Sequence, residues 1–101
     1  MIECEVRGEA SAWRITSAMT HAEAAGLLVA GQKLLMADSM IRPVLIDLSA
    51  VSQADSSGLA VLLDWLRTAE QQGRAVKVQD VPQGLRALAE LYGIDALLNF
   101  A

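Results

Sequence analysis

The stretch Asp55-Ser56-Ser57-Gly58 contains a carboxylate, two hydroxyls and a glycine, directly before the strongest helical pattern in the chain. At the start of a helix, such side chains accept hydrogen bonds from backbone N–H groups that have no partner within the helix. The same end of a helix favours an anion attached to an exposed hydroxyl, because the helix dipole is positive there. These residues therefore allow two uses, a plain helix cap or a functional site built on a hydroxyl.

The tetrapeptide alone favours the plain cap, whereas its position in the chain favours function. It follows a buried strand and a loop, and functional groups in open α/β sheets gather beyond the carboxyl ends of the strands. A phosphoryl group on an exposed serine here would add about 1.5 to 2 negative charges at pH 7. The fold would tolerate that charge at a helix start, while any interface built over it would change.

Other reactive residues are few. His21 is the only histidine and Cys4 the only cysteine, and their positions do not have the spacing of metal ligands. A Ser-His-acid arrangement is not supported, since His21 lies far from Ser56 in the sequence and no pattern predicts that they meet. A strand end and a helix cap explain Asp47 and Asp55. We therefore expect no metal, no cofactor and no catalysis; a small hydrolase using Ser56 is the weakest alternative.

The composition predicts one folded domain over residues 1–101, because 53% of the residues are hydrophobic and 20% are charged. The net charge is -4 and no Lys/Arg cluster occurs, so we expect neither nucleic acid nor an anionic membrane surface as a partner. A single cysteine favours a reducing compartment. With no signal peptide and no apolar run of about 20 residues, the prediction is a soluble cytoplasmic protein without direct membrane insertion.

An antiparallel hairpin is predicted for the first 16 residues. Ile2, Cys4 and Val6 alternate with charged residues, which is the period of a half-buried strand. A turn that begins at Gly8 leads to a second alternating run, in which Trp13 is expected to belong to the core.

A helix is predicted next, beginning at the capping pattern Thr20-His21-Ala22-Glu23 and ending near Asp38. Its apolar residues recur at helical spacing, and Gly31 on that face would permit a close approach to the sheet. The apolar run Val44-Leu45-Ile46-Asp47-Leu48 that follows is typical of a central, parallel strand covered on both faces.

The helix after the Asp-Ser-Ser-Gly stretch has leucines at i, i+3, i+4 and i+7, beginning at Leu59. Val61 and Trp65 lie beside this stripe and widen it. Gly73 is expected to end the helix, and a strand follows over residues 75–79.

A last helix is predicted after that strand, with Asp80 as its cap and Tyr92 on its buried face. The apolar tail over residues 94–100 is expected to fold back on the core. The strand-helix-strand unit that begins at Val44 implies a right-handed crossover and a parallel pair. The sequence therefore predicts a single α/β domain.

The stretch from Ile46 to Leu59, which reads Ile-Asp-Leu-Ser-Ala-Val-Ser-Gln-Ala-Asp-Ser-Ser-Gly-Leu, resembles the signature of STAS domains. The resemblance extends over essentially the whole chain in the order of its elements. It implies a mixed sheet of about four strands with helices packed mainly on one face. It also implies that Ser56, the hydroxyl residue directly after the aspartate, is the regulatory position.

Two branches of the family are compared with the chain. Residues 88–94, residues 59–63 and the short first strand pair are similar to the STAS subunit of a phospholipid-transporting ABC system. Residues 16–20 stand where anti-sigma factor antagonists usually carry a Gly-Glu-Leu-Asp-like turn. On the other side, the Asp-Ser-Ser-Gly stretch itself is common among those antagonists.

The transporter branch implies a non-catalytic cytoplasmic subunit that regulates or assembles the ATPase of an inner-membrane phospholipid ABC transporter. It would reach the permease complex, and so the membrane periphery, through that ATPase subunit. The antagonist branch implies instead a protein switched by phosphorylation of Ser56. For Trp65, ordinary packing against a neighbouring helix or the tail remains an equal alternative to a place at the interface. The resemblance implies that the partner contacts a loop with an apolar flank, formed by Asp55, Ser56, Ser57, Gly58, Val61 and Trp65.

Overall fold

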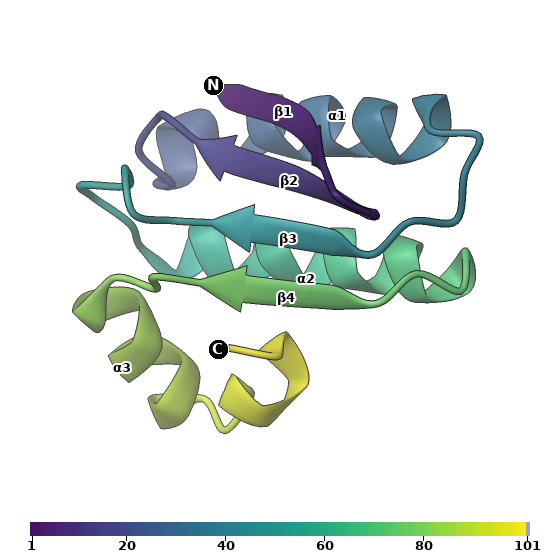
Figure 1. Cartoon of the computed structure of the whole chain (residues 1–101). Coiled ribbons are helices and arrows are strands. Elements are labelled where there is room, and N and C mark those ends of the chain that lie inside the picture. Colours follow the sequence, from purple (N-terminus) through teal and green to yellow (C-terminus); the bar gives the residue numbers. More distant parts are fainter. Residues whose placement is uncertain (101) are drawn as a thin grey trace.

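The computed structural model describes residues 1–100 of the chain. Eight elements follow one another, and every predicted helix and strand is present (Figure 1). In chain order they are β1 (Ile2–Arg7), β2 (Ala10–Ile15), α1 (His21–Ala37), β3 (Val44–Asp47), α2 (Ser56–Gln71), β4 (Val76–Gln79), α3 (Gln83–Leu91) and the 3-10 helix η1 (Asp95–Leu98).

The four strands form one mixed sheet in the order β1-β2-β3-β4. β1 is antiparallel to β2, whereas β2, β3 and β4 are parallel to one another. In Figure 1 both α1 and α2 lie behind the sheet, and the face toward the viewer carries no helix. α3 and η1 lie beyond β4 and contact α2. The predicted α/β fold, a mixed sheet with helices mainly on one face, is confirmed.

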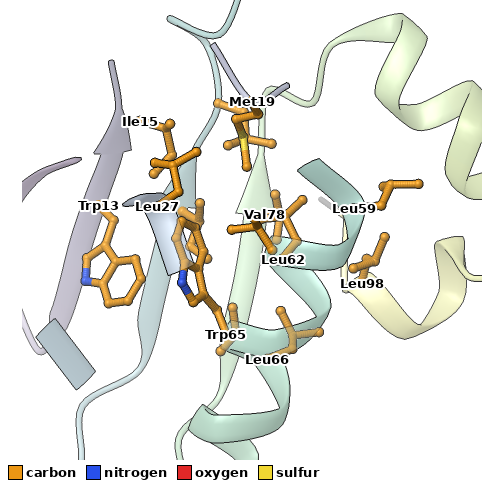
Figure 2. Packing of buried hydrophobic residues seen from close by; sticks show 14 of the residues in the cluster. Trp13, Ile15, Met19, Leu27, Leu59, Leu62, Trp65, Leu66, Val78 and Leu98 are labelled. Atoms are coloured by element: carbon orange, nitrogen blue, oxygen red, sulfur yellow. The ribbon is translucent and has the colours of Figure 1, made fainter. Parts of the chain in front are cut away.

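The core lies between the sheet and the two long helices. Trp13 of β2 is buried as predicted, and its ring meets the ring of Trp65 from α2 edge to face, with centroids 5.4 Å apart (Figure 2). The leucine stripe of α2 is buried at Leu59, Leu62 and Leu66. Burial of this apolar surface is the main source of the fold's stability.

The carboxyl ends of the three parallel strands meet at one edge of the sheet, where the connections to α1 and α2 run side by side. Met19, before α1, forms a parallel bridge with Ala54, before α2. The Met19 N–H donates to the Gln53 carbonyl at 2.8 Å, and the Asp55 N–H donates to the Met19 carbonyl at 3.2 Å. These bonds hold the starts of the two helices together.

In the first helix the predicted capping box is confirmed, whereas the close approach expected at Gly31 is to a different element. The Glu23 carboxylate accepts a hydrogen bond from the Thr20 N–H at 2.9 Å, so the capping box is present. Gly31 permits a close approach, as predicted, but to α2 rather than to the sheet. A Cβ at Gly31 would overlap the indole of Trp65.

The prediction that Cys4 and Val6 lie on the buried face of a half-buried strand was wrong. They are on the helix-facing side, since Cys4 pairs with Trp13 and Val6 with Ser11, yet both are exposed. The reason is that β1 is the edge strand of the sheet, so its far side has no neighbouring strand. The alternation correctly predicted which residues of β1 share the helix-facing side, but it did not predict that this side is exposed to solvent.

The last predicted helix differs in its start and its buried face. Asp80 has a left-handed backbone with φ 54° and does not cap α3, whose N-cap residue is Pro82. Tyr92 lies after α3 and is 56% exposed. In the tail, Leu98 is fully buried, whereas Leu97 points outward.

Candidate functional site

Asp55 lies between the starts of two helices and caps both. One carboxylate oxygen accepts the Ser57 N–H of α2 at 2.8 Å, and the other accepts the His21 N–H of α1 at 3.1 Å. The cap on α2 was predicted, whereas the bond to α1 was not. Asp55 is therefore part of the structure of the loop rather than a free carboxylate.

The pKa of Asp55 is lowered from its ordinary value of 3.8, chiefly by the hydrogen bond from the His21 N–H. The N–H and hydroxyl of Ser57 add to this shift, and burial opposes it. The pKa of the neighbouring Glu23 is also lowered, chiefly by the Thr20 hydroxyl. Both carboxylates are therefore ionised at neutral pH, close to the positive ends of two helix dipoles.

Gly58 is buried against the connection that leads into α1. A Cβ at Gly58 would lie 2.8 Å from the Met19 carbonyl oxygen and 3.1 Å from the Met19 Cβ. Because no real side chain fits at that distance, a glycine is needed for the loop to pack here.

The two serines have different roles. The Ser57 N–H donates to the Asp55 carboxylate at 2.8 Å, and Ser57 is half-buried. Ser56 is exposed and is the first residue of α2. The hydroxyl that a partner or a kinase can reach is therefore that of Ser56.

The expected apolar flank of Val61 and Trp65 was wrong, because their exposed fractions are 0% and 1%. Trp65 is buried where α1 packs on α2, and Gly31 leaves room there for the indole. Val61 belongs to the same hydrophobic core. The indole N–H of Trp65 is buried and has no hydrogen-bond partner among residues 1–100. Trp65 therefore belongs to the core, as the alternative interpretation held.

The exposed side of α2 offers other residues for contact. Ala60 and Arg67 are exposed, and Leu63 is the half-buried leucine at the border of the stripe. Together with Ser56 they share one side of the helix by their spacing. We call Ser56, Ala60, Leu63 and Arg67 the outer arc of α2. The helical spacing of these four positions could be read from the sequence, but the side of α2 that α1 covers could not.

The structure also brings His21 to this loop, which the sequence did not predict. Asp55 accepts the backbone N–H of His21 and the N–H of Ser57, so its two oxygens bond to the main chain. It does not hold the imidazole as the acid of a catalytic triad does. Within residues 1–100 no group of three His, Cys, Asp or Glu side chains could bind a metal ion.

Two cavities lie away from the Ser56 loop. One, of about 460 Å³, lies at the edge of β4 and includes Leu66, Val76 and Phe100 in its lining. The other, of about 450 Å³, lies over the sheet and includes Ala12 and Leu45. Across residues 1–100 there is no helix with the length and apolar character needed to span a bilayer.

A model of the MlaB STAS domain matches residues 3–99. The chain belongs to the STAS domain family. Over 51 residues it is 45% identical to the intermembrane phospholipid transport system binding protein MlaB of Escherichia coli K12, and equally to that of Shigella flexneri. Each match includes 50% of this chain and 53% of the relative, so the chain spans about half the length of the curated relatives it matches.

Solved STAS structures share the fold at low sequence identity. A protein assigned as an anti-sigma factor antagonist from Thermotoga maritima is 12% identical, with a TM-score of 0.84, and the match covers 98% of this chain and 84% of that one. The anti-sigma factor antagonist SpoIIAA in its unphosphorylated form is 16% identical, with a TM-score of 0.77, and the match covers 100% and 88%. At these identities the likeness shows the STAS fold alone.

Proposed function

We propose that this STAS domain is a non-catalytic subunit that binds the ATPase of an inner-membrane phospholipid ABC transporter and supports its assembly or activity. The match of residues 3–99 to the MlaB-type domain carries the proposal. The 45% identity to MlaB proteins of a phospholipid transport system supports it. The chain would then act in the cytoplasm, at the membrane periphery through that ATPase.

The geometry of the loop supports a binding role. Asp55 and Gly58 hold it against the start of α1, so the loop is fixed before any partner arrives. Fixed contact residues lose little conformational entropy on binding. We propose that Ser56 and the rest of the outer arc of α2 contact the ATPase, with Asp55, Ser57 and Gly58 shaping the loop.

Co-purification of the chain with its cognate ATPase subunit tests this. We expect a stable complex, and the variant Ser56→Glu should raise its dissociation constant more than about tenfold, because an unpaired charge enters the interface. The fold should persist, since a carboxylate is favourable at a helix start. Ser39→Glu is the matched control, since Ser39 is exposed and follows α1 at its other end.

Equal binding by the wild type and Ser56→Glu would exclude Ser56 from the interface. Failure of the wild type to bind the ATPase, together with unchanged ATP hydrolysis when it is added, would contradict the proposed function itself.

An anti-sigma factor antagonist switched at Ser56 is the second candidate. The exposure of Ser56 favours it, because a kinase can reach that hydroxyl, whereas Ser57 is half-buried. Incubation with an anti-sigma kinase and ATP, followed by mass spectrometry, should then give a phosphate on Ser56. Ser57→Ala should still be modified and Ser56→Ala should not; an unmodified wild type argues against this candidate.

A further inference from the structure

The face of the sheet opposite α1 and α2 carries no helix (Figure 1). The strand register arranges the residues of this face in two rows. Trp13, Ile46 and Val78 are buried toward the helices. The residues directly before and after each of them along its own strand therefore point to the other side. The strand register then aligns one residue from each strand, from β1 to β4. The first row is Glu3, Arg14, Asp47 and Gln79, and the second row is Glu5, Ala12, Leu45 and Lys77.

These two rows, which we call the open face, have an apolar centre and charged ends. Ala12 and Leu45 lie in the middle of the second row and line the hollow of about 450 Å³. Glu5 and Lys77 lie at its two ends, on the outer strands, and both are exposed. Glu5 also pairs with Arg7 of the same strand at 2.6 Å, where both side chains are about two-thirds exposed and so weakly paired.

The order of charges on the open face of one copy is complementary to that on the open face of a second copy. A two-fold axis along the strands, lying between two such faces, places β1 of one copy opposite β4 of the other and β2 opposite β3. In the second row Glu5 then meets Lys77 of the second copy, and Ala12 meets Leu45. In the first row Arg14 meets Asp47 of the second copy, and Glu3 meets Gln79. Within these rows no like charges are opposed.

We propose that the open face binds a second copy of this chain, sheet against sheet. Packed sheets with strands aligned in this way are a common arrangement of β layers. The contact uses neither Ser56 nor the outer arc of α2, which lies behind the sheet. The proposal therefore stands apart from the proposed binding of an ATPase.

The size and chemistry of the open face determine how strong the dimer is. The open face is formed by four short strands, whereas a standard stable interface buries roughly 800 Å² per partner. The opposed charges lie at the rim, where they set the orientation and are screened by salt. We therefore expect a weak, reversible dimer whose population rises with protein concentration and falls with ionic strength.

Sedimentation equilibrium of the chain, in a concentration series into the millimolar range, tests this with two charge reversals. Lys77→Glu places a glutamate opposite Glu5 of the other copy at both ends of the dimer. Glu5→Lys places a lysine opposite Lys77 of the other copy at both ends. Each variant alone should raise the dissociation constant at least about tenfold. An equimolar mixture of the two should form a heterodimer as strong as the wild-type dimer, because both pairs are again of opposite charge.

Lys33→Glu on α1 and Glu70→Lys on α2 are matched controls, since both residues are exposed and lie on the helices behind the sheet. They should dimerise as the wild type does. Recovery in the mixture also shows that both reversed variants are folded. A wild type that stays monomeric at every concentration overturns the proposal, and the open face would then bind a different protein. A dimer that the single reversals do not weaken also overturns it.

Discussion

At the scale of single residues, Asp55 has the most constrained position near the candidate site. Its carboxylate bonds to the main chain of both α1 and α2, and these bonds lower its pKa. A carboxyl whose pKa is lowered by folding stabilises the native state above its unfolded pKa. That stabilisation is lost as the pH falls through the lower, folded pKa.

The substitution Asp55→Asn should therefore lower the free energy of unfolding most at neutral pH. The difference from the wild type should shrink as the pH falls below about 4, where the aspartate itself is protonated. Chemical denaturation followed by circular dichroism at a series of pH values measures this. Asp80→Asn, at an exposed position that caps no helix, should follow the wild-type curve; a pH-independent difference for Asp55→Asn would contradict the argument.

At the scale of elements, the contact between α1 and α2 depends on a glycine opposite an indole. Gly31 leaves the space that Trp65 fills, and Trp65 in turn meets Trp13 across the core. The other glycine in the interior of α1, Gly26, faces only the methyl end of Met1 at 3.1 Å. The two glycines therefore give opposite expectations for the same substitution.

Gly31→Ala should destabilise the chain by about 1–3 kcal/mol, because the added methyl overpacks the core. Gly26→Ala should leave the stability unchanged or raise it by up to about 1 kcal/mol, because alanine favours the helix and the end of the Met1 side chain can move. Urea denaturation of the two variants measures both values. Equal stabilities would show that the helices move apart at little cost.

The same contact explains what the sequence could and could not predict. Local patterns located the capping box at Thr20, the leucine stripe from Leu59 and the helix end at Gly73, since each depends on residues within a few positions. The burial of Trp65 and the bond from Asp55 to His21 depend on residues more than 30 positions away. No local periodicity contains that information, so the Asp55 cap on α2 was predicted correctly and the burial of Val61 and Trp65 was not.

At the scale of the whole molecule, the end opposite the candidate site is held by a buried arginine. Arg74 is 4% exposed, and it donates to the Arg42 carbonyl at 2.7 Å and to the Asp38 carboxylate at 3.1 Å. The same carboxylate oxygen accepts the Ser11 hydroxyl at 3.2 Å. One guanidinium thus connects the loop between α2 and β4 with the end of α1, and Asp38 extends the network to β2.

Arg74→Leu should lower the free energy of unfolding by about 2 kcal/mol or more, because the Arg42 carbonyl loses a partner and a buried ion pair is broken. Arg67→Leu, an exposed arginine on α2, should stay within about 0.5 kcal/mol of the wild type. Chemical denaturation of both variants gives the comparison. An Arg74 variant as stable as the Arg67 variant would show that the network contributes little.

The bridge between Met19 and Ala54 has a consequence for assembly. The shape of the Ser56 loop comes from residues 19–21 meeting residues 53–58, so it exists only after β2 and β3 have paired. A partner that recognises this shape discriminates between finished chains and incompletely folded ones. Because it binds only the folded chain, it also shifts the folding equilibrium toward the native state by mass action. Recognition at Ser56 would therefore act as quality control on each molecule before it enters a complex.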